Sequence, residues 1–418
     1  MQTKIILEKQ IKKVDPKTGS IIQFYNPIGK SLVEKFNPIS EWTAIRDRLG
    51  TWPFGMINPK KDNSSIVYNF SLFDYLGMSQ HPEVLKAAEQ AIQTYGISSS
   101  SSPSLNGRTE LSEVLENKTA ELLQKETCLL YSSGWAACFG AVAGIANSKD
   151  TIIIDQLAHN CLSTAAKFAT NNVHKFRHNN LNHLDQLLKK AREENANNTL
   201  LIVLESLYSM NSTRPDFREV MELADQYEAI VIIDVAHELG VGGAKGLGVL
   251  EDTDISVDNL IITGSFSKVF GTNGGFVVGP KCIRSHFLAF SPTYAFSSAM
   301  SPIQSAIILK SLEIAFSEEG DALRKQVRER SQYFRKQLSK NGFEIDGQAS
   351  AIIPLIVGAE ELSREMFPRL VDEGLLVNLI EFPVVQRGRS LFRFLLSPLK
   401  TYEELDRTVD IVTRARIS

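Results

Sequence analysis

Short apolar runs alternate with amphipathic segments through the middle of the chain, and this alternation limits the folds that the chain can adopt. The runs are TCLLYSS, TIIID, TLLIVLES, AIVIIDVAH and NLIITGS, all between residues 127 and 265. Segments with the apolar spacing of helices, such as NHLDQLLKKAREE and DFREVMELADQYE, lie between them. Strands that are apolar on both faces and are joined by helices predict an α/β fold with a mostly parallel sheet covered by helices.

Changes of pattern along the 418 residues predict three regions. Residues 1–60 are rich in turn formers and predict an N-terminal arm or cap. Residues 61–300 contain the alternation and predict a large cofactor-binding domain, whereas residues 301–418 contain long helices and short strands and predict a smaller C-terminal α+β domain. Ligands of parallel sheets bind at the carboxyl ends of the strands, so we expect the functional site in the large domain.

Charge and cysteine usage narrow the class of function. The 45 Lys and Arg residues against 48 Asp and Glu residues give a net charge of -3 without blocks of like charge, so neither nucleic acid nor an anionic membrane is expected as a partner. No apolar run reaches the roughly 20 residues that a membrane-spanning helix needs. The 4 cysteines lack CxxC spacing, which indicates reduced thiols and a cytoplasmic protein that acts on small molecules.

Polar residues follow the apolar runs where a parallel sheet places its ligands. A carboxylate directly after an apolar strand, as at Asp234, is costly to bury without a partner. A serine and a glycine that open a helix can offer backbone N–H groups to a phosphate. The positions of interest are Ser133, Gly134, Trp135, His159, Ser209, Asp234 and His237.

Lys268 lies in the stretch GSFSKVFGTNGG, among small and hydroxyl residues that include Ser265. A lysine removed from water has a lowered pKa and can form a Schiff base with an aldehyde. Asp234 would keep a pyridine nitrogen protonated, the serines and the helix start would bind a phosphate, and His159 would stack on a ring. Together these residues predict a site for pyridoxal 5'-phosphate.

Eight motifs in this order resemble those of the α-oxoamine synthases, the pyridoxal phosphate enzymes that include 8-amino-7-oxononanoate synthase, 2-amino-3-ketobutyrate CoA ligase, 5-aminolevulinate synthase and serine palmitoyltransferase. The motifs are FSLFDYLGMSQHPEV, SSGWAA, DQLAHNCL, ESLYSMN, DVAHELG, GSFSKVFGTNGGFVVG, FSSAMSP and SLFRFLLSPLKTYEELD, within about residues 65–415. The resemblance implies the fold-type I architecture of aspartate aminotransferase and a homodimer with shared active sites. It also implies the decarboxylative condensation of an amino acid with an acyl thioester to give an α-aminoketone.

The resemblance implies roles for individual residues. Lys268 would carry the Schiff base, Asp234 would pair with the pyridine nitrogen, and His237 would contact the ring hydroxyl. His159 would stack on the ring, and Arg393 would bind the carboxylate of the amino acid. The other implied cofactor contacts are Ser133, Gly134, Trp135, Ser209, Ser265 and Ser298, the last supplied by the neighbouring subunit.

The chain departs from the family pattern at positions that concern the substrates. The stretch SSSSSP at residues 98–103 replaces GSGGSR, Asn211 replaces an aspartate, Glu238 replaces a serine or alanine, and Lys400 replaces a histidine. The family favours glycine, alanine or serine as the amino acid. Glu238 raises the alternative of a larger or basic amino acid such as arginine, as in the similar synthase domain of saxitoxin assembly. Either CoA or an acyl carrier protein can carry the acyl group.

Two further functions share part of the pattern. A pyridoxal phosphate aminotransferase or lyase would share Lys268 and Asp234 but would consume no thioester. A non-catalytic partner subunit would lack the lysine, so Lys268 argues against that function.

Three histidines could also suggest a metal site. His174, His178 and His183 have polar flanks and no acidic residue placed with them, so we interpret them as part of a solvated connector and expect no metal.

Overall fold

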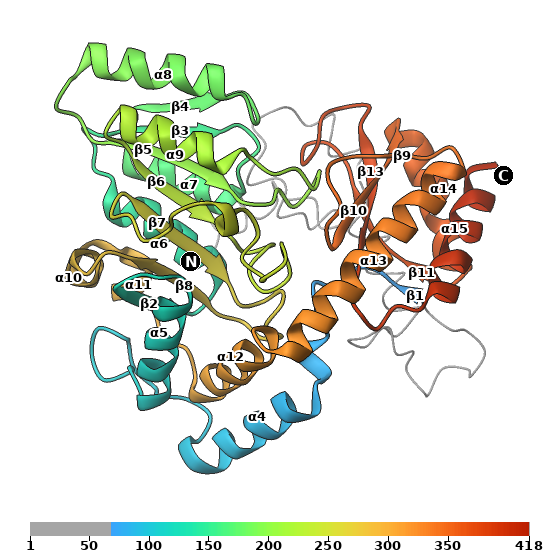
Figure 1. Cartoon of the computed structure of the whole chain (residues 1–418), viewed down its shortest axis with the longest axis horizontal. Coiled ribbons are helices and arrows are strands. Elements are labelled where there is room, and N and C mark those ends of the chain that lie inside the picture. The colour runs from blue at the N-terminus through green and yellow to red at the C-terminus, as the bar shows by residue number, and fades with distance from the viewer. Residues whose placement is uncertain (1–67, 418) are drawn as a thin grey trace, which may run out of the picture.

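The computed structural model describes residues 68–417, so the predicted arm at residues 1–60 lies outside the described residues. A seven-stranded sheet with helices on both faces forms a large unit, and a four-stranded sheet with helices forms a smaller one (Figure 1). The long helix α13 (Glu318–Lys340) runs between the two. None of the described helices is long and apolar enough to cross a membrane.

The strands of the large sheet lie in the order β2-β8-β7-β6-β5-β3-β4, and all of them except β8 run in the same direction. This confirms the predicted α/β class and the mostly parallel sheet. The strands β4 and β8 were not predicted, because β4 is short and polar and β8 begins within a glycine-rich stretch. The bounds are β2 (Thr127–Tyr131), β3 (Thr151–Asp155), β4 (Val173–Phe176), β5 (Leu200–Glu205), β6 (Ile230–Asp234), β7 (Leu260–Ser265) and β8 (Gly275–Gly279).

Two hydrophobic cores cover the two faces of this sheet. Successive side chains of a strand point to opposite faces, so Ile153 belongs to one core and Ile154 to the other. The face with Ile154 packs against α6 (Gly134–Ile145), α7 (Asn160–Ala169), α10 (Cys282–Phe290) and α11 (Pro292–Ala295). The face with Ile153 packs against α4 (Pro82–Tyr95), α5 (Glu110–Leu122), α8 (Leu181–Glu194), α9 (Phe217–Gln226) and α12 (Pro302–Ala315).

The smaller unit has its own core, in which Phe334, Phe367 and Phe392 are buried. Its antiparallel sheet has the order β12-β13-β10-β9. The predicted boundary near residue 301 stays a prediction, and α12, which follows it, packs against α4 and α5 of the large unit. The elements are β9 (Glu344–Ile345), β10 (Ile352–Gly358), α14 (Glu360–Asp372), β12 (Asn378–Ile380), β13 (Ser390–Leu395) and α15 (Tyr402–Ile417).

Shorter elements complete the fold. The strand β1 (Tyr68–Asn69) pairs in parallel with β11 (Leu375–Leu376), which attaches the first described residues to the smaller unit. Two short 3₁₀ helices, η3 (Met78–Gln80) and η4 (Gly248–Asp252), lie within connecting segments.

The strands β7 and β8 form a hairpin whose connecting loop contains Lys268. Ser265 pairs with Gly275 in the sheet, and the N–H of Phe266 donates to the carbonyl of Gly274 at 3.0 Å. Gly271 in this loop has a positive φ of 72°, and a Cβ added there would lie 2.9 Å from the backbone nitrogen of Ser79. The loop is therefore closed at its base and packed against η3.

We expect the centre of the large sheet to dominate stability. Ile262 in β7 is fully buried, so Ile262→Ala should lower the free energy of unfolding by about 2–5 kcal/mol through lost burial and a cavity. Urea denaturation measures the change, with Lys175→Ala on the exposed side of β4 as the control. Equal effects of the two variants would contradict this view of the core.

Candidate active site

Three neighbouring parallel strands end in polar residues at one edge of the large sheet. The last residues of β5, β6 and β7 are Glu205, Asp234 and Ser265. Glu205 and Asp234 are partners in the ladder, and Asp234 pairs with Thr263 on its other side. This is the edge at which ligands of α/β sheets bind, so the fold brings the predicted residues to a suitable place.

Asp234 is a buried carboxylate with a donor on each oxygen. Its Oδ1 accepts the N–H of Ala236 at 2.9 Å, and its Oδ2 accepts the S–H of Cys138 at 3.2 Å. These bonds fix the carboxylate at the end of an apolar strand, 7% exposed. A fixed carboxylate of this kind stabilises a proton on a heterocyclic nitrogen bound beside it.

Lys268 is partly buried, and its amine forms no hydrogen bond or ion pair with any residue that the structure describes. Burial, followed by the charges of Lys268 and Arg393, holds the pKa of His237 well below its ordinary value. The neutral ring of His237 lies with Nδ1 2.9 Å from the Tyr75 hydroxyl. Lys268 therefore offers an unpaired amine close to a neutral imidazole.

The start of α6 brings together the residues that were predicted to form a phosphate cup. Ser133 caps the helix by accepting the N–H of Ala136 at 3.2 Å, and the N–H groups of Gly134 and Trp135 have no acceptor within the helix. A Cβ at position 134 would overlap the side chain of Ser265, so only glycine allows the helix start to come this close to β7. N–H groups and hydroxyls therefore converge here, as an anion requires.

The side chains of Ser265 and Trp135 differ in their surroundings. The Ser265 hydroxyl lies 2.7 Å from that of Ser267 and is buried beside the cup. The Trp135 indole is 45% exposed and stacks on Phe139 with ring centroids 5.2 Å apart. Trp135 thus contributes a backbone donor to the cup and an aromatic ring to the surface.

Arg393 has a buried donor that no described group satisfies. Its Nη1 donates to the carbonyl of Ser209 at 3.2 Å, and its guanidinium carbon lies 5.2 Å from the centroid of the Phe73 ring. The Nε atom is buried without a hydrogen-bond partner among the described residues. An unsatisfied, buried guanidinium N–H fits a site for a carboxylate ligand.

His159 stands at the start of α7, and its backbone N–H donates to Glu205 Oε1 at 2.7 Å. His159 is exposed, whereas Glu205 is buried. The backbone of His159 is therefore tied to the end of β5, which positions its ring at the same sheet edge as Asp234.

Glu238 lies in a buried ion pair instead of an open substrate site. Its carboxylate has no exposed surface, forms an ion pair with Arg214 and accepts the N–H of Val249 at 3.3 Å. A cationic substrate side chain would have to displace Arg214 from it. The predicted substrate contact therefore has no support from the geometry.

Ser298 is exposed and belongs to the segment after α11. The serine run contacts this segment, because Ala299 donates its N–H to the carbonyl of Ser101 at 3.0 Å and Ser102 donates its hydroxyl to the carbonyl of Ala295 at 3.1 Å. The serine run, which replaces the glycine-rich loop of the family, therefore holds the segment that contains Ser298 through these two hydrogen bonds.

Sequence reasoning missed several residues of the site. Tyr75 and Phe73 lie in the motif FSLFDYLG, which was recognised as a whole but not residue by residue. Cys138 and Cys161 resemble ordinary core cysteines in an apolar context, and only the fold brings them beside Asp234.

The interpretation of the histidines as a solvated connector is wrong. His174 is part of β4. His178 lies with Nδ1 3.0 Å from Asp155 Oδ1 and with Nε2 2.7 Å from the Thr213 hydroxyl, so it joins the end of β3 to a neighbouring loop.

Comparison with known proteins supports a functional interpretation of this arrangement. Residues 65–412 match the family model described as aminotransferase class I and II. The 8-amino-7-oxononanoate synthase of Petrotoga mobilis is 29% identical over 87% of this chain and 90% of its own length. The 2-amino-3-ketobutyrate coenzyme A ligase of Salmonella typhimurium is 31% identical over 84% of this chain and 88% of its own length.

A solved structure is similar over nearly its whole length. The serine palmitoyltransferase of Sphingomonas wittichii superposes with a TM-score of 0.80 and 25% identity, covering 92% of this chain and 98% of that one. The predicted fold-type I architecture is thereby confirmed.

The buried ion pair of Glu238 yields a test. Arg214→Leu should lower the free energy of unfolding by about 3 kcal/mol, because it leaves a buried carboxylate without its partner. The double variant Arg214→Leu/Glu238→Leu should recover much of this loss, and chemical denaturation of the three proteins measures both effects. If Arg214→Leu unfolded like the unchanged protein, the carboxylate would be free to serve another role.

Proposed function

Because the chain belongs to the class I and II aminotransferase family, and within it to the α-oxoamine synthases, we propose that it condenses a small amino acid with an acyl thioester. The enzyme is an acyltransferase that depends on pyridoxal phosphate and forms an α-aminoketone with loss of carbon dioxide. The observation that carries this proposal is the unpaired amine of Lys268 at the same sheet edge as the buried carboxylate of Asp234.

The residues fit the cofactor at each of its ends. Asp234 would pair with the ring nitrogen, and His237 would contact the ring hydroxyl. The phosphate would bind the N–H groups at the start of α6 together with the hydroxyl of Ser265. When bound, pyridoxal phosphate accepts the electrons that a substrate carbon retains after it loses a proton.

Lys268 is proposed as the covalent attachment point and as the base. Its Nζ, once replaced by the amino group of the substrate, would remove the proton from the α-carbon. Asp234 would hold the proton on the ring nitrogen, without which the ring withdraws electrons poorly. Arg393 would orient the carboxylate of the amino acid through its unsatisfied Nε, and His159 would cover the ring.

The buried ion pair of Glu238 supports a small amino acid as the substrate. The ion pair with Arg214 leaves Glu238 no free carboxylate for a basic side chain, so arginine is the weaker alternative. The choice among glycine, alanine and serine, and between CoA and an acyl carrier protein, is open to direct assay. An aminotransferase or lyase would release no free thiol from an acyl thioester, which separates those functions from the proposed one.

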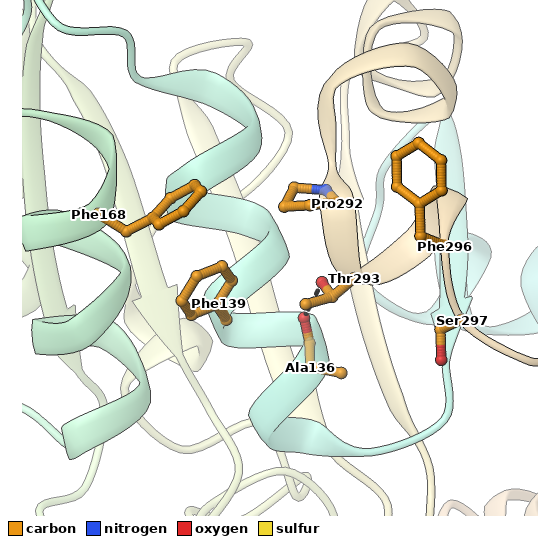
Figure 2. Close-up of a pocket in the computed structure, with 7 residues that line it drawn as sticks. All are labelled: Ala136, Phe139, Phe168, Pro292, Thr293, Phe296 and Ser297. Atoms are coloured by element: carbon orange, nitrogen blue, oxygen red, sulfur yellow. Dashed lines mark hydrogen bonds between the residues drawn. The ribbon is translucent and has the colours of Figure 1, made fainter. Parts of the chain in front are cut away.

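We also propose that two copies of the chain form a homodimer through the surface beside the phosphate cup. A pocket of about 380 Å³ lies there between α6, α7 and α11. Figure 2 shows the rings of Phe139 and Phe168 on one side of it and Pro292 and Phe296 on the other. Phe296 is 89% exposed and Phe168 66%, and large apolar side chains grouped in this way indicate a protein interface.

The position of this surface supports a shared active site. Ala136 lines the pocket one residue after Trp135, and Ser297, next to Ser298, lines it from the other side. A second copy seated here would bring its own Ser298 towards the phosphate cup of the first.

We propose a cytoplasmic location for the protein. The free thiols of its four cysteines support this proposal, because such thiols persist in a reducing compartment.

The Lys268 side chain provides the direct test of function. Lys268→Ala should remove the visible absorbance of lysine-bound pyridoxal phosphate and abolish the release of thiol from an acyl thioester, because both the attachment point and the base are lost. Lys281→Ala, at the exposed start of α10, is the matched control. Thiol release at the unchanged rate by Lys268→Ala would refute the proposed function.

Phe296 tests the proposed dimer. Phe296→Asp should weaken self-association at least about tenfold, because a charge would be buried in an apolar interface, and should weaken cofactor binding with it. Sedimentation velocity measures the association state, with Val384→Asp, at an exposed position of the smaller unit, as the control. An unchanged sedimentation profile would place the interface elsewhere.

A further inference from the structure

Two buried cysteines lie between Asp234, which is proposed to pair with the ring nitrogen of the cofactor, and His159, which is proposed to cover the ring. Cys138 belongs to α6 and Cys161 to α7, and these two helices pack against each other on the same face of the sheet. The sulfur atoms of both cysteines and a carboxylate oxygen of Asp234 lie within 4.8 Å of one another. The other two cysteines, Cys128 and Cys282, are outside this group.

Cys138 binds the carboxylate of Asp234. Its S–H donates to Asp234 Oδ2 at 3.2 Å, and the hydroxyl of Thr263 lies 3.7 Å from its sulfur. Because Oδ1 of Asp234 already accepts the N–H of Ala236, the thiol supplies the second anchor of the carboxylate. Removing the thiol leaves the hydrogen bond from Ala236 as the one remaining described anchor of the carboxylate, so its orientation is less restricted.

Cys161 binds the ring of His159. Its sulfur lies 2.9 Å from His159 Nδ1, and its backbone N–H lies 3.3 Å from the same nitrogen. The sulfur and Nδ1 are close enough to share one proton. This contact sets the rotation of the imidazole, while the bond from the backbone N–H of His159 to Glu205 fixes the main chain.

We propose that Cys138 and Cys161 are positioning residues of the cofactor site, which couple the carboxylate at the ring nitrogen to the imidazole that covers the ring. This inference rests on the proposed function, because it takes Asp234 and His159 to be the cofactor contacts. Neither thiol reacts with substrate in it. The two sulfur atoms lie within 4.8 Å of each other, so they form a contiguous row from Asp234 through Cys138 and Cys161 to His159.

The charges within the row agree with this geometry. The hydrogen bond to Cys161 raises the pKa of His159 to about 9. The hydrogen bond from Cys138, and then the contact with His159, lower the pKa of the Cys161 thiol, whereas the contact with Cys161 and burial raise the pKa of Cys138. These shifts favour a thiolate at Cys161 and an imidazolium at His159, while Cys138 keeps its proton and donates it to Asp234.

A positively charged His159 would act differently from a neutral one. An imidazolium is protonated on both ring nitrogens, so Nδ1 would donate to the sulfur instead of accepting the N–H of Cys161, and Nε2 could donate to an oxygen of the substrate. Loss of Cys161 should return the pKa of His159 towards its ordinary value. Any step that needs the imidazolium would then fail at a lower pH than in the unchanged enzyme.

The experiment compares Cys161→Ala and Cys161→Ser with Cys282→Ser and Cys128→Ala as matched cysteine controls. In the apo protein, ultraviolet absorbance of the thiolate should show one thiol that ionises below the usual range, and both Cys161 variants should lack it. In the holoenzyme, the upper limb of the kcat–pH profile should move down by about one pH unit or more in Cys161→Ala, with little change of KM. Cys161→Ser keeps a hydrogen-bonding group and should move the limb less.

Cys138 has its own readout. Cys138→Ala should lower kcat about tenfold and change the visible absorbance of the bound cofactor, because Asp234 loses a donor. Cys138→Ser keeps a donor and guards against misfolding of the alanine variant, so it should retain most of the activity.

Several results would overturn the inference. Unchanged pH profiles and cofactor spectra in the Cys161 and Cys138 variants would leave the thiols without a positioning role. A stoichiometric metal ion held by the two thiols, or a disulfide between them in the active enzyme, would also overturn it. Failure of the unchanged protein to bind pyridoxal phosphate would instead refute the proposed function, and the thiol titration of the apo protein would still test the row itself.

Discussion

The parallel pairing of β5, β6 and β7 is the constraint on which the site depends. Because these strands run in register, Glu205, Asp234 and Ser265 end at one edge of the sheet. The apolar residues before them fill two cores, and this burial prevents any strand from sliding without exposing them. The polar ends are thus held in place by hydrophobic packing at some distance from the chemistry.

Around that edge, each side chain is fixed by contacts within the protein. Donors on both oxygens orient Asp234, the Tyr75 hydroxyl orients His237, and Glu205 fixes the backbone of His159. The amine of Lys268 and the Nε of Arg393 differ, because no described group binds them. Groups left without partners inside such an ordered site are the ones available to ligands.

The sequence was most informative where a local pattern has one structural meaning. The apolar runs located β2, β3, β5, β6 and β7, and the strand ends located Asp234. The surroundings of Glu238 depended on Arg214, and those of Asp234 on Cys138, which are tertiary contacts without a local signal. Likewise, β8 begins with glycines and runs antiparallel to both of its neighbours, so its place in the sheet could be identified only from the fold.

The closed hairpin between β7 and β8 has a consequence for turnover. The pairing of Ser265 with Gly275 holds the base of the loop, and Gly271 within the loop packs closely against η3. The main chain around Lys268 therefore has little conformational freedom. In the proposed function, the movement of the lysine amine during each cycle would therefore come from the four methylene groups of its side chain. Because the backbone of the loop stays fixed, the side chain would return the amine to the same position after each product is released.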